Sequence, residues 1–237
     1  MDTLKEVRRA LRKAASNEKA SILSRFFKTG KGEYGEGDRF LGVTVPEQRR
    51  IAKKFQGGAD RELVVAMLDL PYHEERLTAL FLLTHLFEKG LRTGGAGKWV
   101  ELYLSKTDRV NNWDLVDSSA YQILGRWLED RDRAVLYRLA DSKSLWENRI
   151  AVVATLHFIR RGDLTDVLRL SETMLTHRHD LMHKATGWML REAWKRDVAA
   201  VEGFLDAHAV RMPRTMLRYA IERMDREVRN GYLLMGR

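Results

Sequence analysis

The sequence predicts an all-α protein, built as a superhelical solenoid of paired helices with a concave face. Apolar residues recur at 3.6-residue spacing along the chain, and no segment alternates apolar and polar residues convincingly enough to be a half-buried strand. Long apolar helices begin near Tyr72, Asn112, Leu145 and Leu181, so successive starts are 40, 33 and 36 residues apart. Repeats of this period are typical of HEAT-like helix pairs, which stack on a common core.

The apolar pattern and its breaks give the elements in order. An amphipathic, charged helix covers residues 1–16, and a glycine-rich acidic loop at about 29–42 lies between two helices. Pro46, Pro71 and Pro213 stand where helices begin, because a missing N–H costs nothing in a first turn. Shorter, more polar helices are predicted at 98–104, 133–140 and 165–175, as the outer partners of the long ones. About a dozen helices result, in a single domain spanning residues 1–237.

Composition limits the classes of protein and partner. The 42 Lys and Arg exceed the 33 Asp and Glu, and the net charge of +9 favours an anionic partner. The absence of cysteine excludes a disulfide scaffold, a Cys-ligated metal site and a thiol nucleophile. The charged N-terminal helix has no apolar signal core, and no run approaches ~18 apolar residues. We therefore expect a protein that is neither secreted nor membrane-spanning.

Three basic residues occupy equivalent positions in the proposed repeats. Aligning the long helices places Arg76, Arg149 and Lys184 in register near their starts. In a solenoid such residues become neighbours on the concave face, where they would form a stripe that follows phosphates. Alternatively, each one caps its turn or is simply solvated.

The segment from Arg109 to Asp117 is the most unusual in the chain. Trp113 and Asp117 are four residues apart and so share one helix face, while Leu115 and Val116 must face the core. An aromatic ring beside a carboxylate on an exposed surface indicates a site for an electron-poor or cationic ligand. The alternative is a Trp that closes a seam between helices beside a solvated Asp117.

A second tryptophan, Trp188, follows a glycine in mid-helix. Gly187 costs a helix about 1 kcal/mol relative to Ala. Close approach of a ligand to the backbone beside Trp188 would explain that cost, and so would a contact between helices. Trp127 and Trp194 have the spacing of ordinary core or seam residues.

Two further motifs are weak. The glycines from Gly30 to Gly37 resemble a phosphate loop, but no strand precedes them and the acidic residues Glu33, Glu36 and Asp38 would repel phosphate. We interpret this segment as a flexible surface loop that could order on a partner. The histidines His177, His179 and His183 match no standard zinc spacing, so we predict no metal site.

Several segments together resemble the AlkD-type bacterial DNA alkylation repair proteins. They are LGVTVPEQRR (41–50), NWDLVD (112–117), LWENRIAVVATL (145–156) and KATGWMLREAW (184–194), and the similarity runs from about residue 21 to 223. The resemblance implies a right-handed superhelical solenoid of HEAT-like helix pairs whose concave face binds duplex DNA. It further implies hydrolysis of the N-glycosidic bond of N3- and N7-alkylated purines by a monomeric, cytoplasmic, nucleoid-associated bacterial protein.

The same resemblance assigns roles to residues. Asp117 matches the catalytic carboxylate, Trp113 and Trp188 match the aromatic pair on the lesion nucleotide, and Arg149 matches the arginine that holds the DNA backbone. The family's early lesion-facing tyrosine falls on Phe26, which keeps the ring and loses the hydroxyl. This change and the atypical acidic loop both bear on which substrates the protein accepts. For the phosphate contacts we expect Arg76, Arg149, Lys184 and Arg191.

The chemistry suits these residue types. Alkylation makes the purine a cationic leaving group, so no strong general acid is needed, and a carboxylate can stabilise the oxocarbenium-like transition state or position water. Neither a metal nor an organic cofactor is required. Two other functions remain open, a catalytically silent relative that binds damaged or branched DNA and a HEAT-like scaffold that binds proteins.

Overall fold

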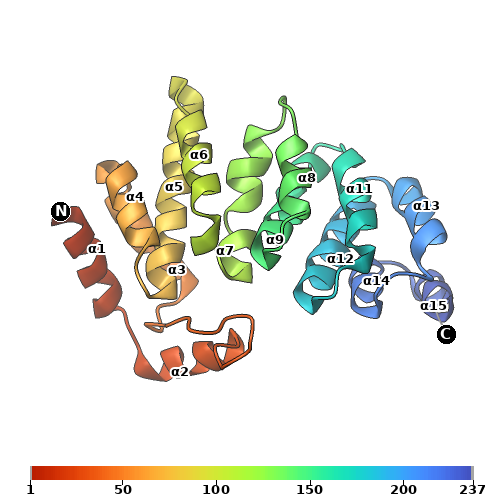
Figure 1. Cartoon of the computed structure of the whole chain (residues 1–237), viewed down its shortest axis with the longest axis horizontal. Coiled ribbons are helices and arrows are strands. Elements are labelled where there is room, and N and C mark those ends of the chain that lie inside the picture. The colour runs from red at the N-terminus through yellow and green to blue at the C-terminus, as the bar shows by residue number, and fades with distance from the viewer. Residues whose placement is uncertain (1, 236–237) are drawn as a thin grey trace. The chain divides into compact units, whose positions relative to one another are not determined.

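The computed structural model describes residues 2–235, which are helical with no strand among them (Figure 1). One isolated bridge pairs Arg39 with Tyr72. The chain divides into two compact units, Met1–Ser119 and Ala120–Arg237, here termed the first and the second unit. The prediction of an all-α protein is confirmed. The stacking of helix pairs into one solenoid stays a prediction.

The first unit consists of seven α-helices and two 3₁₀ turns within its described residues. They are α1 (Asp2–Lys13), α2 (Asn17–Phe26), α3 (Val45–Phe55), η1 (Gln56–Gly58), α4 (Arg61–Leu68), α5 (His73–Thr93), α6 (Gly97–Ser105), η2 (Thr107–Arg109) and α7 (Trp113–Asp117). In Figure 1, α2 lies across the ends of the other helices of this unit. None of its residues is buried, so α2 forms an outer wall rather than part of the core.

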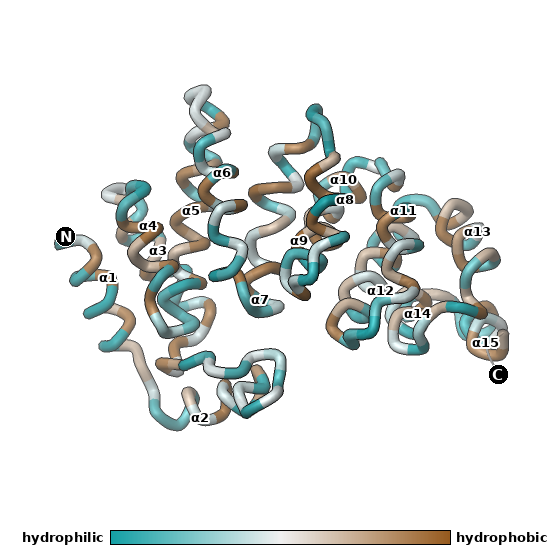
Figure 2. Tube along the Cα trace, viewed as in Figure 1, coloured by the Kyte–Doolittle hydropathy of each residue, from teal (hydrophilic) through white to brown (hydrophobic). Residues whose placement is uncertain are grey.

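The core of the first unit is built on α5. Its side chains Leu77, Leu80, Leu83 and Phe87 are almost completely buried, and α3, α4 and α6 pack against it. Figure 2 shows apolar residues recurring along this helix. The polar residues of its first turn are also buried, which requires partners for every charge there.

The second unit continues with helices of the same kind. They are η3 (Tyr121–Gly125, a π-helix), α8 (Ala134–Ala140), α9 (Leu145–Ala154), α10 (Leu156–Ile159), α11 (Thr165–Thr173), η4 (Met174–Thr176), α12 (Asp180–Trp194), α13 (Val198–His208), α14 (Arg214–Ala220) and α15 (Arg226–Leu234). Here α12 is central, because α9, α11, α13 and α14 all pack against it.

The predicted helix starts agree with these elements. The long helices expected near Tyr72, Leu145 and Leu181 are α5, α9 and α12, and the short ones expected between them are α6, α8 and α11. Pro46 lies in the first turn of α3, and Pro213 directly precedes α14. The helix expected from Asn112 is present but interrupted, since α7 has five residues and turns separate it from η3.

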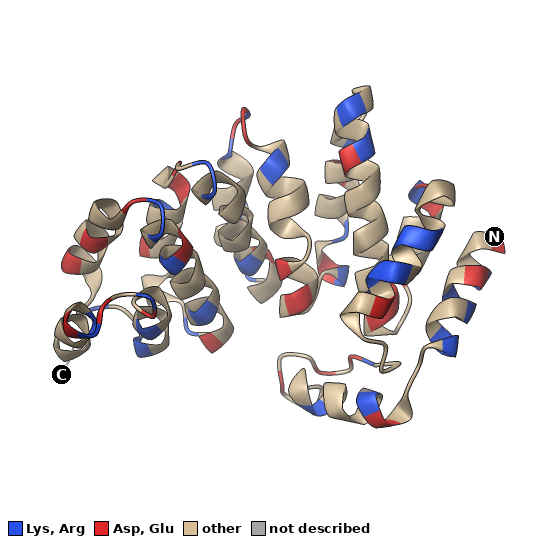
Figure 3. Cartoon of the chain, turned by 180° about the vertical axis from the view of Figure 1, so that it is seen from behind, with Lys and Arg blue, Asp and Glu red and all other residues tan. Residues whose placement is uncertain are grey.

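Charged residues of both signs are distributed over each unit (Figure 3). None of the helices within residues 2–235 has the length and apolar character needed to cross a lipid bilayer.

Candidate active site

The segment singled out in the sequence forms the start of α7. Asn112 is the N-cap and is fully buried, and its Oδ1 accepts a hydrogen bond from the Trp113 backbone N–H at 2.8 Å. Asn112 Nδ2 reaches Asp38 Oδ2 at 3.4 Å. The cap therefore fixes where the helix begins and places Trp113 in its first turn.

The two carboxylates of this segment have different environments. Asp114 Oδ2 lies 2.8 Å from His73 Nε2, and its Oδ1 accepts from the Leu115 N–H at 2.9 Å. Both oxygens of Asp114 are thus engaged within the protein. Asp117 lies one turn further along the helix and lines the same pocket as Trp113. Both carboxylates line this pocket, and Asp114 is the one whose side chain contacts His73.

A pocket of about 610 Å³ lies within the first unit beside α7. Its walls are mainly apolar and come from α2, the segment at residues 40–46 and the start of α7. Phe26, Trp113 and Asp117 all line it, so three of the residues predicted for lesion contact and catalysis share one cavity. The Phe26 ring is 60% exposed and meets Trp113 edge to face, with ring centroids 5.9 Å apart.

Stacked rings form the floor of this pocket. Phe27 stacks on Trp113 at 5.1 Å between centroids and on Phe40 at 5.0 Å, and Phe40 stacks on His73 at 4.6 Å. Phe27 and Phe40 are buried. The indole of Trp113, which is half-buried, is therefore held from below by packed rings while part of it faces the cavity.

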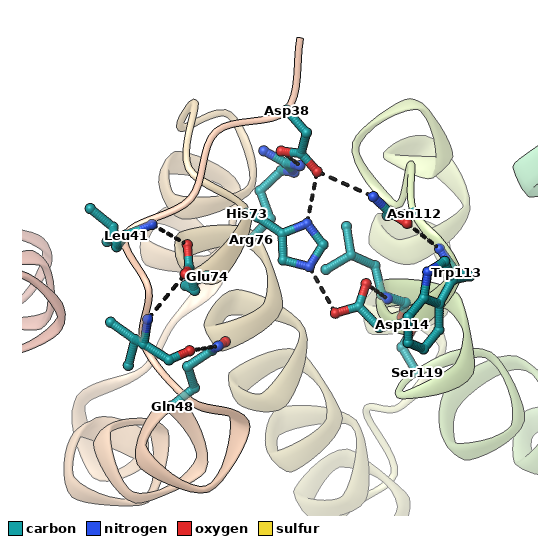
Figure 4. Close-up of polar contacts among 12 residues, drawn as sticks. Asp38, Leu41, Gln48, His73, Glu74, Arg76, Asn112, Trp113, Asp114 and Ser119 are labelled. Carbon is teal, nitrogen blue, oxygen red and sulfur yellow. Dashed lines mark hydrogen bonds and ion pairs between the residues drawn. The ribbon is translucent and has the colours of Figure 1, made fainter. Parts of the chain in front are cut away.

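A buried cluster of charges lies next to these rings (Figure 4). The Nδ1 of His73 donates to Asp38 Oδ2 at 2.8 Å, and Arg76 Nη2 donates to Asp38 Oδ1 at 2.7 Å. Burial alone would lower the pKa of His73, but the charges and hydrogen bonds of Asp114 and Asp38 outweigh it and raise that pKa to about 9. Burial would raise the pKa of Asp38, yet His73 and Arg76 lower it to about 2. The cluster is thus ionised at neutral pH.

The second half of the glycine-rich loop differs from the sequence prediction. The Asp38 side chain is 3% exposed and ion-paired, and the Glu74 carboxylate accepts backbone N–H groups of Leu41, Gly42 and Val43 at 2.7–3.2 Å. A flexible surface loop was expected over residues 29–42, but its residues from Asp38 onward are held by α5. The physical reason is that the buried charges of α5 need partners, and this segment supplies them.

Among the predicted phosphate-binding residues, Arg76 has an internal role. It is 3% exposed, and its guanidinium contacts Asp38 and the Pro71 carbonyl. The ion pair with Asp38 gives Arg76 a structural role in the charge cluster, and its contact with phosphate stays a prediction.

The other predicted residues belong to the second unit. Arg149 is 5% exposed and its Nη1 donates to the Leu181 carbonyl at 2.6 Å. Lys184 is partly exposed and pairs with Asp180 at 2.9 Å, and Arg191 pairs with Glu222. Each of these cations therefore has a partner within its own unit, and their contacts with phosphate stay predictions.

Trp188 is half-buried on α12, and Gly187 next to it is explained by packing. A Cβ at Gly187 would lie 2.4 Å from the Met216 carbonyl oxygen, because α14 crosses α12 at this point. Of the two explanations that the sequence left open for Gly187, the structure supports the contact between helices.

The histidines near the start of α12 have structural contacts. His177 Nε2 lies 3.2 Å from Asn148 Oδ1, and His183 Nε2 lies 2.5 Å from the His177 carbonyl oxygen. Across residues 2–235, no three or more His, Asp or Glu side chains are grouped so that they could hold a metal.

Four residues of this site were not predicted from the sequence: His73, Asp38, Phe27 and Phe40. A signal was present for His73, since HEER places four polar residues at the start of a long helix that is otherwise largely apolar and buried. Such residues must find buried partners. No local pattern marked Asp38 as that partner, because 35 residues separate the two.

Comparisons with known proteins were made for the whole chain. A family model described as DNA alkylation repair enzyme matches residues 7–224. No curated protein matches. Among solved structures, the "Predicted DNA alkylation repair enzyme from Enterococcus faecalis" superposes with a TM-score of 0.71 at 16% identity, covering 90% of this chain and 97% of that one. At that identity the likeness concerns the fold.

Proposed function

Because this chain belongs to the DNA alkylation repair enzyme family, we propose that it is a monofunctional DNA glycosylase acting on N3- and N7-alkylated purines in duplex DNA. The observation that carries the proposal is the shared pocket of Trp113, Phe26 and Asp117. Its second carboxylate, Asp114, is already engaged by His73. One carboxylate beside exposed aromatic rings suits a cationic, electron-poor nucleotide.

The reaction breaks the bond between the sugar C1′ and the purine nitrogen. An alkylated purine carries a positive charge, so the bonding electron pair leaves with the base, which becomes neutral. Positive charge then develops on the sugar, and the Asp117 carboxylate stabilises it and orients the attacking water. Water forms the new C1′–O bond and releases one proton to the solvent. The aromatic rings of Trp113 and Phe26 contact the lesion nucleotide.

We extend the proposal to DNA binding by the second unit. Trp188 would contact the lesion nucleotide, and Arg149, Lys184 and Arg191 would contact phosphates. Phosphate oxygens accept charge-assisted hydrogen bonds from guanidinium and ammonium groups, so these residue types suit such contacts. In this proposal the protein acts as a monomer and binds DNA on a concave face formed by HEAT-like helix pairs.

Release of free base from methylated duplex DNA tests this proposal. The native protein is incubated with the DNA, and free 3-methyladenine and 7-methylguanine are measured by chromatography. The proposal requires release of at least one of the two well above the spontaneous rate. Binding without release would instead support a silent DNA-binding relative, and the absence of both would support a protein-binding scaffold.

A further inference from the structure

We propose that His73 and Asp38 are positioning residues for the excision reaction. Together they hold Asp114, and through it the first turn of α7, so that Trp113 and Asp117 stay directed into the pocket. The inference rests on the proposed function for its kinetic test, and a spectroscopic test examines it independently of catalysis.

Three segments that are distant in the sequence meet at His73. Asp38 comes from the loop before α3, His73 begins α5 and Asp114 lies in α7. Each ring nitrogen of His73 is 2.8 Å from a carboxylate oxygen. A carboxylate can only accept, so both nitrogens must donate, and the ring is an imidazolium. A neutral ring could donate to only one of the two carboxylates, and its other nitrogen would then face a carboxylate oxygen at 2.8 Å with no proton between them.

The helix that this cluster holds cannot place itself. An isolated helix is marginal below about 12–15 residues, and α7 has five. Its position must therefore come from tertiary contacts. Asn112 and Asp114 flank Trp113, and these two residues contact Asp38 and His73 respectively. The same cluster thus ties down the chain on both sides of the indole, as Figure 4 shows.

Stability alone does not explain a cluster of this kind. A buried ion pair recovers little more than its desolvation cost, and apolar side chains of similar volume stabilise a core as well or better. His73 and Asp114 also line the pocket without offering it an unengaged polar atom. Their position beside the candidate catalytic carboxylate indicates that the charges fix geometry there.

The spectroscopic test compares His73→Gln with the native protein. Chains labelled with ¹⁵N-tryptophan give indole N–H resonances, and Trp113→Phe identifies that of Trp113. We expect the Trp113 resonance to shift or broaden in His73→Gln, while those of Trp188 and Trp194 remain in place. An unchanged Trp113 resonance in a folded His73→Gln protein would overturn the inference.

The kinetic test separates positioning from DNA affinity. In His73→Gln we expect the single-turnover excision rate to fall about tenfold to a hundredfold, the scale for a misplaced reacting group. The Kd for duplex DNA should stay within about twofold, because phosphate contacts dominate affinity. The control is His157→Gln, which removes a buried histidine 3.0 Å from Glu129 in the second unit. An equal loss of excision in the control would contradict a specific role for His73.

If His73→Gln does not fold, a second variant, Asp38→Asn, tests the same inference. Asp38→Asn keeps an oxygen that accepts from His73 Nδ1 and removes only the charge, so we expect the same changes with a smaller amplitude. If the native protein releases no alkylated base, the proposed function fails, and the Trp113 resonance in either variant still accepts or rejects the positioning role.

Discussion

Phe26 and Phe27 are adjacent in the chain, yet their rings have opposite environments. The Phe26 ring is 60% exposed at the edge of the pocket, whereas Phe27 is 6% exposed and stacks between Trp113 and Phe40. Phe26, at the end of α2, thus exposes its ring at the pocket. The next residue, Phe27, buries its ring in the core. Substitutions at these two positions can therefore separate the effect of a ring on excision from its effect on the stability of the fold.

Replacement of each ring by Ala should have different effects. In Phe26→Ala we expect the free energy of unfolding to change by no more than about 0.5 kcal/mol and excision to fall, because an exposed ring contributes little burial. In Phe27→Ala the free energy of unfolding should fall by about 3–5 kcal/mol. Thermal denaturation and base release measure the two effects. A large loss of stability in Phe26→Ala would contradict its role in recognition.

At the scale of single residues, the sequence places Trp113 and Asp117 on one helix face, because i and i+4 share a face, and both line the pocket. Their roles in recognition and catalysis stay predictions. The sequence did not distinguish the environments of Asp114 and Asp117. That distinction depends on His73, which is 41 residues from Asp114, and no local pattern encodes such a contact.

At the scale of elements, the crossing of α12 and α14 depends on a residue without a side chain. The backbone of Gly187 faces the Met216 carbonyl and the Tyr219 Cβ so closely that no Cβ fits between them. Gly203 in α13 has the same helical setting and open space around it. The two glycines form a matched pair.

The substitution Gly→Ala should therefore change stability in opposite directions at these positions. At Gly203 it should raise the free energy of unfolding by up to about 1 kcal/mol, through helix propensity. At Gly187 the steric overlap costs about 1–3 kcal/mol and exceeds that gain, so the protein is destabilised. The melting temperatures of the two variants test this, and equal stabilisation at both sites would show that α14 is free to move away.

The interruption after α7 shows where an apolar pattern stops being a guide. The pattern from Asn112 predicts one long helix, but the structure has turns at residues 118–119 and a π-helix from Tyr121. Ser119 Oγ donates to the Leu115 carbonyl, and Gly125 lies against the Ala154 carbonyl. These contacts widen the helix locally without changing which residues face the core, so the apolar pattern hides the break.

At the scale of the whole molecule, the charge cluster makes stability depend on pH. The pKa of His73 is raised from 6.5 to about 9 by Asp114 and Asp38, against the effect of burial. A raised pKa in the folded state stabilises the protein fully below the unfolded pKa, and this stabilisation is lost as the pH rises through 9.

We therefore expect the free energy of unfolding to fall between pH 6.5 and 9.5, by an amount on the order of 3 kcal/mol from His73. Urea denaturation at several pH values measures it. In His73→Gln this component should be absent, so the difference between the two proteins should shrink as the pH rises. A difference independent of pH would contradict the ionised state of His73.

DNA binding should depend strongly on salt, given the net charge of +9. For each phosphate neutralised, log affinity should fall by about 0.9 per unit of log salt concentration. In Arg149→Ala we expect weaker binding and a slope smaller by about one. The control for a loss of packing is Arg133→Ala, which removes an arginine that pairs with Asp163 and Asp166. An unchanged slope in a folded Arg149→Ala protein would remove Arg149 from the interface.

Most of the helices could be predicted from the sequence, because burial of one face imposes the 3.6-residue period directly. The long-range contacts could not. Glu74 and His73 hold the segment at residues 38–43, which directly follows glycines and acidic residues typical of a solvated loop. Gly42 itself takes a φ of +81° and packs against Ser16, so its conformation reflects a close approach that the sequence does not reveal.

The proposed excision depends on the negative charge of Asp117, and a substitution that removes only this charge is its sharpest test. Native protein and Asp117→Asn are compared in single-turnover release of 7-methylguanine from duplex DNA, with DNA affinity and melting temperature measured alongside. Asn is nearly isosteric and uncharged, so excision should fall about 10²-fold or more while affinity and stability are kept. Release at the native rate by Asp117→Asn would show that excision does not depend on the Asp117 carboxylate.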